Sequence, residues 1–176
     1  MKSLDPHRWS ATQTRSPLGS FESVQRTTFP APVVERSTAG AKRLADLYWD
    51  EVERSTFGAI RTRGSAGGLD LRLLGSGFAL LRFGPPVHAV SSTSVSCLYP
   101  ILGGLLARAP AGSISFTQAG VDIVEVSSAI SGFFPRLATR HQRRRWNGVL
   151  YPHVQARLHV ALSQRYFARL RQDARR

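Results

Sequence analysis

The side chains of this chain that could do acid–base chemistry are few and dispersed. Glu125 is the most suggestive, because by parity it shares one face of an expected strand with Val121 and Ile123. A carboxylate among apolar neighbours has a raised pKa and can act as a general acid or base. A carboxylate on a solvent-facing surface pairs instead with an arginine, and the abundance of arginine in this sequence favours that alternative.

A second group of polar side chains lies along one expected strand. Thr93, Cys97 and Tyr99 alternate on one face, where they would provide polar groups in an otherwise apolar pocket if that face points inward. Cys97 is the only cysteine, so the chain has no internal disulfide, as is usual in a reducing compartment. No base is evident beside Cys97, which favours a buried packing thiol over a nucleophile.

Motifs for metal or nucleotide chemistry do not occur. The sequence has no HExxH, CxxC, GxxxxGK or GxSxG pattern, and Gly75-Ser76-Gly77 is typical of a hairpin turn. His153 and His159 are six residues apart on an expected helix and therefore lie on different faces, while His88 is typical of a surface or satisfied core histidine. The sequence therefore predicts no metal site and no cofactor, and leaves any catalytic residue unknown.

The strongest charge signal is a cluster of arginines followed by a tryptophan. The net charge is +13 and the only lysines are Lys2 and Lys42, so this basic protein owes its charge almost entirely to arginine. Such a cluster is either a solvated loop or a phosphate-binding site with an aromatic ring for stacking. The anionic partner would be a nucleic acid, an anionic membrane surface or an acidic protein. The candidate anion-binding residues are Arg140, Arg143, Arg144, Arg145 and Trp146.

The elements that would position these residues are mostly strands. From Thr56 to Phe134 short apolar–polar alternations are separated by glycine- and proline-containing turns, a pattern that predicts an antiparallel meander. Phe21–Phe29 is a possible first strand, with a polar extended tail as the alternative, which gives about six or seven strands. From Leu98 to Arg108, Pro100 and the glycines predict a bent connection that packs on the sheet or rims a cavity mouth.

Two helices complete the expected architecture. Ser37 or Thr38 caps a helix that runs to about Glu53. A longer helix is expected from about Tyr151 to Asp173, with a wide apolar arc that suits a concave surface. Its apolar ridge consists of Leu158, Leu162, Tyr166 and Leu170.

This order of elements resembles the START/Bet v 1-like helix-grip superfamily over residues 20–173. The resemblance implies a curved antiparallel sheet that wraps a long terminal helix and encloses an apolar cavity. The chain departs from the pattern in having one helix where the family has two after the first strand, and the family has no common catalytic set to carry over. The pocket residues expected on this basis are Thr93, Cys97, Tyr99, Glu125, Leu158, Leu162 and Tyr166.

We therefore expect a disordered tail over residues 1–20 and a single α+β domain over 21–176. No apolar run approaches the roughly 20 residues of a membrane span and no signal peptide is apparent, which predicts a cytoplasmic protein. The expected function is binding of an apolar small molecule or lipid between the sheet and the C-terminal helix. The alternatives are nucleic-acid or anionic-surface binding through residues 140–145, a scaffold or assembly subunit, and an enzyme that uses few polar groups.

Overall fold

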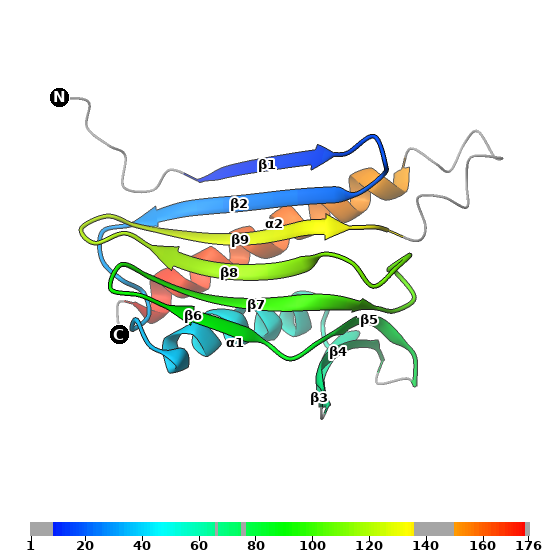
Figure 1. The fold of residues 1–176 in the computed structure, drawn as a ribbon, viewed down its shortest axis with the longest axis horizontal. Coiled ribbons are helices and arrows are strands. Elements are labelled where there is room, and N and C mark those ends of the chain that lie inside the picture. Colours follow the sequence, from blue (N-terminus) through cyan, green and yellow to red (C-terminus); the bar gives the residue numbers. More distant parts are fainter. Residues whose placement is uncertain (1–8, 66, 75–76, 136–149, 175–176) are drawn as a thin grey trace.

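The computed structural model describes residues 9–65, 67–74, 77–135 and 150–174, with the side chains of the last helix described from Val160 onward. Within these residues the fold is α+β, with nine strands and two helices (Figure 1). The elements are β1 (Ser10–Arg15), β2 (Phe21–Phe29), α1 (Thr38–Ser55), β3 (Ile60–Ser65), β4 (Gly68–Leu73), β5 (Ala79–Phe83), β6 (Val87–Val90), β7 (Ser94–Gly103), β8 (Ser113–Ala119), β9 (Val124–Phe133) and α2 (Leu150–Asp173).

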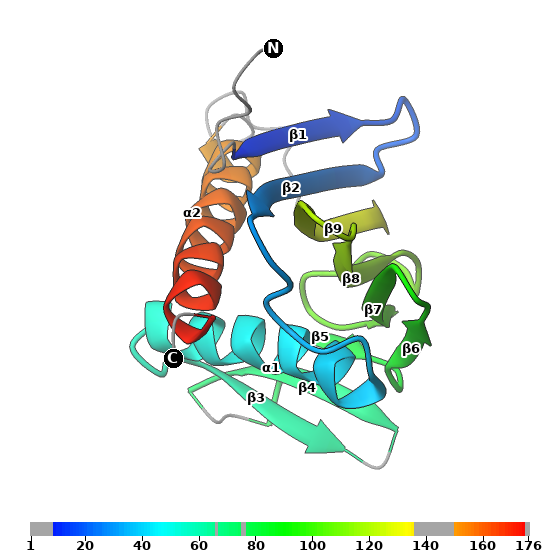
Figure 2. The same cartoon turned by 90° about the vertical axis from the view of Figure 1, so that its left-hand side faces the viewer.

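The nine strands form one antiparallel sheet whose order is β1-β2-β9-β8-β7-β5-β4-β3, with β6 paired to β7. The sheet bends so that β3 and β4 pass beneath α1, while β2 and β9 lie against α2 (Figure 2). Both helices cover the same inner face. The predicted α+β class and antiparallel sheet are confirmed, but the sheet is larger than the predicted six or seven strands.

Two strands account for the difference. β1 pairs with β2 along its whole length and lies inside the stretch that was expected to be disordered. The expected single strand from Val87 to Tyr99 is divided into β6 and β7 by a turn, in which the Ser91 hydroxyl accepts hydrogen bonds from the N–H groups of Thr93 (3.3 Å) and Ser94 (2.9 Å). Serine and threonine occur in both strands and turns. The alternating pattern of side chains therefore continues through the turn, and the sequence does not distinguish the turn from a strand.

Helix α1 begins where its sequence predicts. Ser37 is the N-cap, and its hydroxyl accepts a hydrogen bond from the Gly40 N–H at 3.1 Å. The apolar stripe of the helix is almost completely buried against the sheet and contains Leu44, Leu47, Tyr48, Trp49 and Val52.

The predicted bend after Leu98 is replaced by a continuous strand. β7 passes through Pro100, which pairs with Ser113, and it ends at Gly103. Ile101 is buried, whereas Leu102 and Leu105 remain exposed. A proline is accepted here because its missing N–H removes only one bond, and its carbonyl still accepts from the Gly84 N–H at 2.9 Å.

The expectation of a long terminal helix that the sheet wraps along its length is wrong. Among the described side chains of α2, only a short segment is buried. Ser163, Tyr166, Phe167 and Leu170 are buried, and Tyr166 contacts Phe116 of β8 with ring centroids 6.1 Å apart. The segment also lies against α1, because α1 occupies much of the concave face. Neither helix in the described part has both the length and the apolar character required to cross a bilayer.

Candidate functional site

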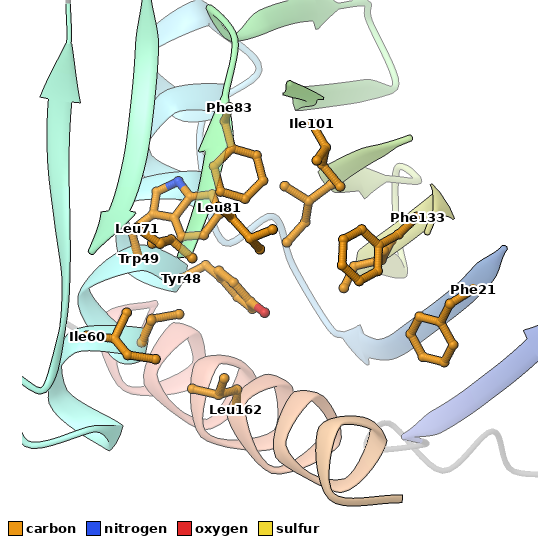
Figure 3. Close-up of a pocket in the computed structure, with 13 residues that line it drawn as sticks. Phe21, Tyr48, Trp49, Ile60, Leu71, Leu81, Phe83, Ile101, Phe133 and Leu162 are labelled. Atoms are coloured by element: carbon orange, nitrogen blue, oxygen red, sulfur yellow. The ribbon is translucent and has the colours of Figure 1, made fainter. Parts of the chain in front are cut away.

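A cavity of about 150 Å³ lies between the concave face of the sheet and the two helices (Figure 3). Its position follows from the architecture. Both helices contribute side chains to the lining, and so do seven strands: β2, β3, β4, β5, β7, β8 and β9. In the part of the chain that the structure describes, 13 residues line the cavity: Phe21, Tyr48, Trp49, Val52, Ile60, Leu71, Leu81, Phe83, Ile101, Ile114, Ile130, Phe133 and Leu162.

The lining is apolar and has one aromatic wall. The rings of Tyr48 and Trp49 are 5.3 Å apart and nearly perpendicular, and Trp49 lies 5.2 Å from Phe83. Figure 3 shows the Tyr48 ring projecting from α1 into the space surrounded by the other labelled side chains. Among the described lining residues, Tyr48 and Trp49 are the only ones whose side chains carry a polar atom. The cavity can therefore hold an apolar molecule with at most a minor polar group.

The pocket residues expected from the sequence are divided among three places. Leu162 lines the cavity. Cys97, Tyr99 and Tyr166 are buried in the core that surrounds it but are not part of the lining. The two remaining described positions are exposed: Thr93 in the turn between β6 and β7, and Glu125 on β9.

Glu125 forms an ion pair with Arg26, with Nη1 and Oε1 3.4 Å apart. This is the solvent-facing alternative that the sequence favoured. The side chain of Leu158 and the whole cluster Arg140, Arg143, Arg144, Arg145 and Trp146 lie outside the described residues.

Burial holds the titratable groups around the cavity in their neutral forms. Desolvation raises the pKa of the Cys97 thiol to about 11 and that of Tyr99 to about 12. The same cause raises the pKa of Tyr48 and of Tyr166 far above the ordinary tyrosine value. All four groups are protonated at neutral pH, so none of them is prepared to act as a nucleophile or a base. Within the described residues, no three His, Cys, Asp or Glu side chains come together to hold a metal ion.

Sequence reasoning missed most of the cavity lining because it searched for polar groups. Ile114 and Ile130 lie opposite each other on β8 and β9, and Ile101 follows on β7, all at positions whose parity was readable from the alternation. The usable signal was the size of the inward side chains: a large aliphatic or aromatic residue from nearly every strand points to the same space.

No family model, no curated protein and no solved structure matches this chain.

Proposed function

We propose that this protein binds an apolar small molecule or the apolar portion of a lipid in the cavity between the sheet and the helices. The observation that carries the proposal is the cavity itself, about 150 Å³ lined by 13 aliphatic and aromatic residues. The apolar lining offers water few hydrogen-bond partners, whereas an ordered water in a protein usually has two to four. Filling it with an apolar group therefore costs no hydrogen bonds and restores lost packing contacts.

The volume limits the size of the ligand. Sites for drug-sized molecules occupy roughly 300–1,000 Å³, whereas an apolar cavity of about 150 Å³ is known to accept benzene. The molecule that fits this cavity of about 150 Å³ without rearrangement is a single ring or a short stretch of acyl chain. The aromatic wall of Tyr48, Trp49 and Phe83 offers edge-to-face contacts to a ring.

The topology also supports this function. The strand β2 near the N-terminus pairs with the last strand β9, and both helices lie on the concave face. We propose the same function that the resemblance to the helix-grip superfamily implies, since the members of that superfamily include lipid carriers.

The first test is to identify what the protein carries. The intact chain is purified without denaturation, measured by native mass spectrometry and then extracted with organic solvent. We expect an additional mass that organic extraction removes and that corresponds to an apolar compound. A protein that carries no such mass and also fails to bind added benzene or short alkylbenzenes in calorimetric titration contradicts the proposal.

The second test fills the cavity from α2. Leu162→Trp places a larger ring in the lining, and we expect at least about tenfold weaker binding of the alkylbenzene probes, since roughly 1.5–3 kcal/mol of apolar burial is lost. The matched control is Leu102→Trp, which makes the same change at an exposed position on β7 and should leave the affinity unchanged. Equal losses in both variants would show that the probes bind elsewhere.

A second candidate function is binding of an anionic partner, favoured by the net charge of +13. The segment proposed for it is Arg140, Arg143, Arg144, Arg145 and Trp146. On duplex DNA each neutralised phosphate contributes about 0.9 to the slope of log affinity against log salt, so replacing the four arginines with alanine should flatten that slope. Filter binding at two salt concentrations measures it, and no retention at low salt would exclude this function.

A further inference from the structure

Four large apolar side chains are exposed together at one end of strands β3–β5. Phe57 follows α1, Leu73 and Leu74 lie at the end of β4, and Phe78 precedes β5. Their exposed fractions are 99% for Phe57, 76% for Leu74, 70% for Phe78 and 44% for Leu73. Single exposed apolar residues are ordinary, but a group of them marks an interaction surface. We call these four residues the apolar tip.

Backbone pairing holds the apolar tip together. Leu73 is paired with Ile60 at the start of β3, and the Leu74 N–H donates to the Ala59 carbonyl at 2.6 Å. The end of β4 is thereby fixed beside the loop that carries Phe57. In Figure 2 the C-terminal end of α1 and the end of β4 lie on the same side of the molecule, at the lower left.

Two of the four residues adopt a backbone conformation that favours glycine. The N–H of Phe57 donates to the Arg54 carbonyl at 3.1 Å and the N–H of Gly58 to the Glu53 carbonyl at 2.8 Å, which is the pattern of a Schellman motif. Glycine usually occupies the position of Phe57, whose φ is 52°, and Leu74 has φ 50°. Bulky side chains are rare at such angles, and strained, exposed apolar residues are found at binding sites more than in passive loops.

Beside the apolar tip, the outer face of β3–β5 is basic. Arg61 lies directly across from Arg72, although like charges in this position repel each other. Arg63 is opposite Asp70, and Asp70 is in turn opposite Arg82. Among the described residues of this face, Arg72 and Asp70 form an ion pair with Nη2 and Oδ2 2.8 Å apart, and Arg61, Arg63 and Arg82 are exposed. The charge of Asp70 is thus already offset by Arg72, and the face retains a positive field.

We propose that this end of the molecule docks on an anionic lipid bilayer. The apolar tip enters the boundary between headgroups and acyl chains, and Arg61, Arg63 and Arg82 contact the anionic headgroups. A nucleic acid would use the arginines but would leave the aliphatic Leu73 and Leu74 in water. A bilayer surface satisfies both features at once, because it presents negative charge directly above an apolar layer. Docking of this kind uses surface residues alone and does not require the cavity to be occupied.

The test is co-sedimentation of the full chain with lipid vesicles. Vesicles of phosphatidylcholine alone are compared with vesicles of phosphatidylcholine and phosphatidylglycerol at equal total lipid and low salt. We expect the protein to bind the mixed vesicles and to bind phosphatidylcholine much more weakly. Absence of binding to the mixed vesicles overturns the inference, and so does retention by single-stranded RNA without vesicle binding.

The decisive variant is Phe57→Gly, because glycine adopts this backbone angle without strain. We expect its melting temperature to equal or exceed that of the wild type while its affinity for mixed vesicles falls roughly tenfold. Phe78→Ser provides an independent loss at a second position of the tip. Leu18→Ser is the matched control, since Leu18 is 85% exposed in the turn between β1 and β2 and should not contribute.

The arginines are tested separately. Arg61→Gln and Arg63→Gln should each lower the affinity for mixed vesicles by roughly fivefold, with no change on phosphatidylcholine alone. Arg15→Gln, an exposed arginine at the end of β1, is the control with the same chemistry. Wild-type affinity in Phe57→Gly and Phe78→Ser, or equal losses in Arg15→Gln and Arg61→Gln, would contradict docking through this end.

Discussion

The two helices cover the same concave face, but α2 adds buried polar contacts to the apolar packing that both helices share. Helix α1 contacts the sheet through buried apolar residues such as Leu44 and Leu47. Helix α2 has a polar seam in its buried face: the Ser163 hydroxyl lies 3.1 Å from the Ser128 hydroxyl on β9 and donates to the Gln25 side-chain oxygen on β2 at 3.2 Å. All three seam residues are completely buried.

We infer that this difference allows a cavity to persist beside α2. Apolar contacts have no preferred direction, so a helix held only by them can shift until the space is filled. Hydrogen bonds fix direction and distance, and breaking them inside a protein leaves polar groups without partners. Ser163 follows the cavity-lining Leu162, so the seam holds α2 in place directly beside the cavity.

The largest expected effect is alkaline unfolding centred where the two helices meet. Tyr48 of α1 and Tyr166 of α2 lie with ring centroids 5.5 Å apart, and burial raises the pKa of both above the ordinary value of about 10. Burial also raises the pKa of Tyr99 to about 12. Because the folded-state pKa values are raised, the stability is complete below pH ~10 and is lost as pH rises through the folded-state values. Phenolate absorbance and circular dichroism should change together in one transition.

The Tyr166→Phe variant sharpens this test. The Tyr166 hydroxyl has no hydrogen-bond partner among the described residues, so its removal should cost little near pH 7. We expect the alkaline midpoint to move to higher pH. The measurement is made with Tyr151 replaced by Phe, because the side chain of that fourth tyrosine lies outside the described residues. Phenolate formation at pH ~10 with the fold intact would then mean that the buried tyrosines are open to water.

Among single substitutions, truncating a buried apolar residue of α1 should destabilise the protein most. Leu44 of α1 is completely buried, and Leu44→Ala should lower the free energy of unfolding by about 2–5 kcal/mol. Urea denaturation followed by circular dichroism measures the change. The same substitution at the half-exposed Leu73 should cost much less. Similar losses at the two positions would indicate that α1 is not packed as described.

Breaking the polar seam should have a smaller effect on stability. Gln25→Met keeps the length of the side chain but removes the acceptor for Ser128 and Ser163 and the donor to Ser23 at 2.6 Å. We expect a loss of about 1–3 kcal/mol, because buried hydroxyls lose partners. If the seam holds the cavity open, this variant should also bind alkylbenzenes more weakly than the wild type. Unchanged stability and affinity would leave the cavity without this explanation.

The sequence predicted those elements whose signals are local. Helix α1 could be predicted because its cap, Ser37, and its apolar stripe lie within one stretch of chain. Strand β2 was expected over the same residues that the structure shows, Phe21–Phe29. Leu162 was placed on the inner side of the last helix by its spacing from Tyr166, and it lines the cavity.

The features that escaped prediction depend on partners far away in the sequence. Ser23, Gln25 and Thr27 alternate with other polar residues, so β2 read equally well as a polar tail, yet all three are buried. Residues from β9 and α2 provide hydrogen-bond partners for the buried side chains of β2, which compensates for their loss of water. No signal in the sequence near β2 predicts these distant partners. The cavity escaped for a related reason, since empty space is a property of many side chains together and belongs to no single motif.

The smallest expected effect comes from the ion pairs that link the two helices. Arg43 and Asp173 are 2.6 Å apart and Arg169 and Asp50 are 3.2 Å apart, each pair with at least one side chain more than half exposed. Exposed pairs contribute about 0–1 kcal/mol, since water screens them and ordering long side chains costs entropy. A double-mutant cycle with Arg43→Ala and Asp173→Ala, measured by urea denaturation, should therefore give a coupling energy below ~1 kcal/mol that decreases further in high salt. A coupling larger than the loss caused by Gln25→Met would mean that charge, and not the buried seam, holds α2 in position.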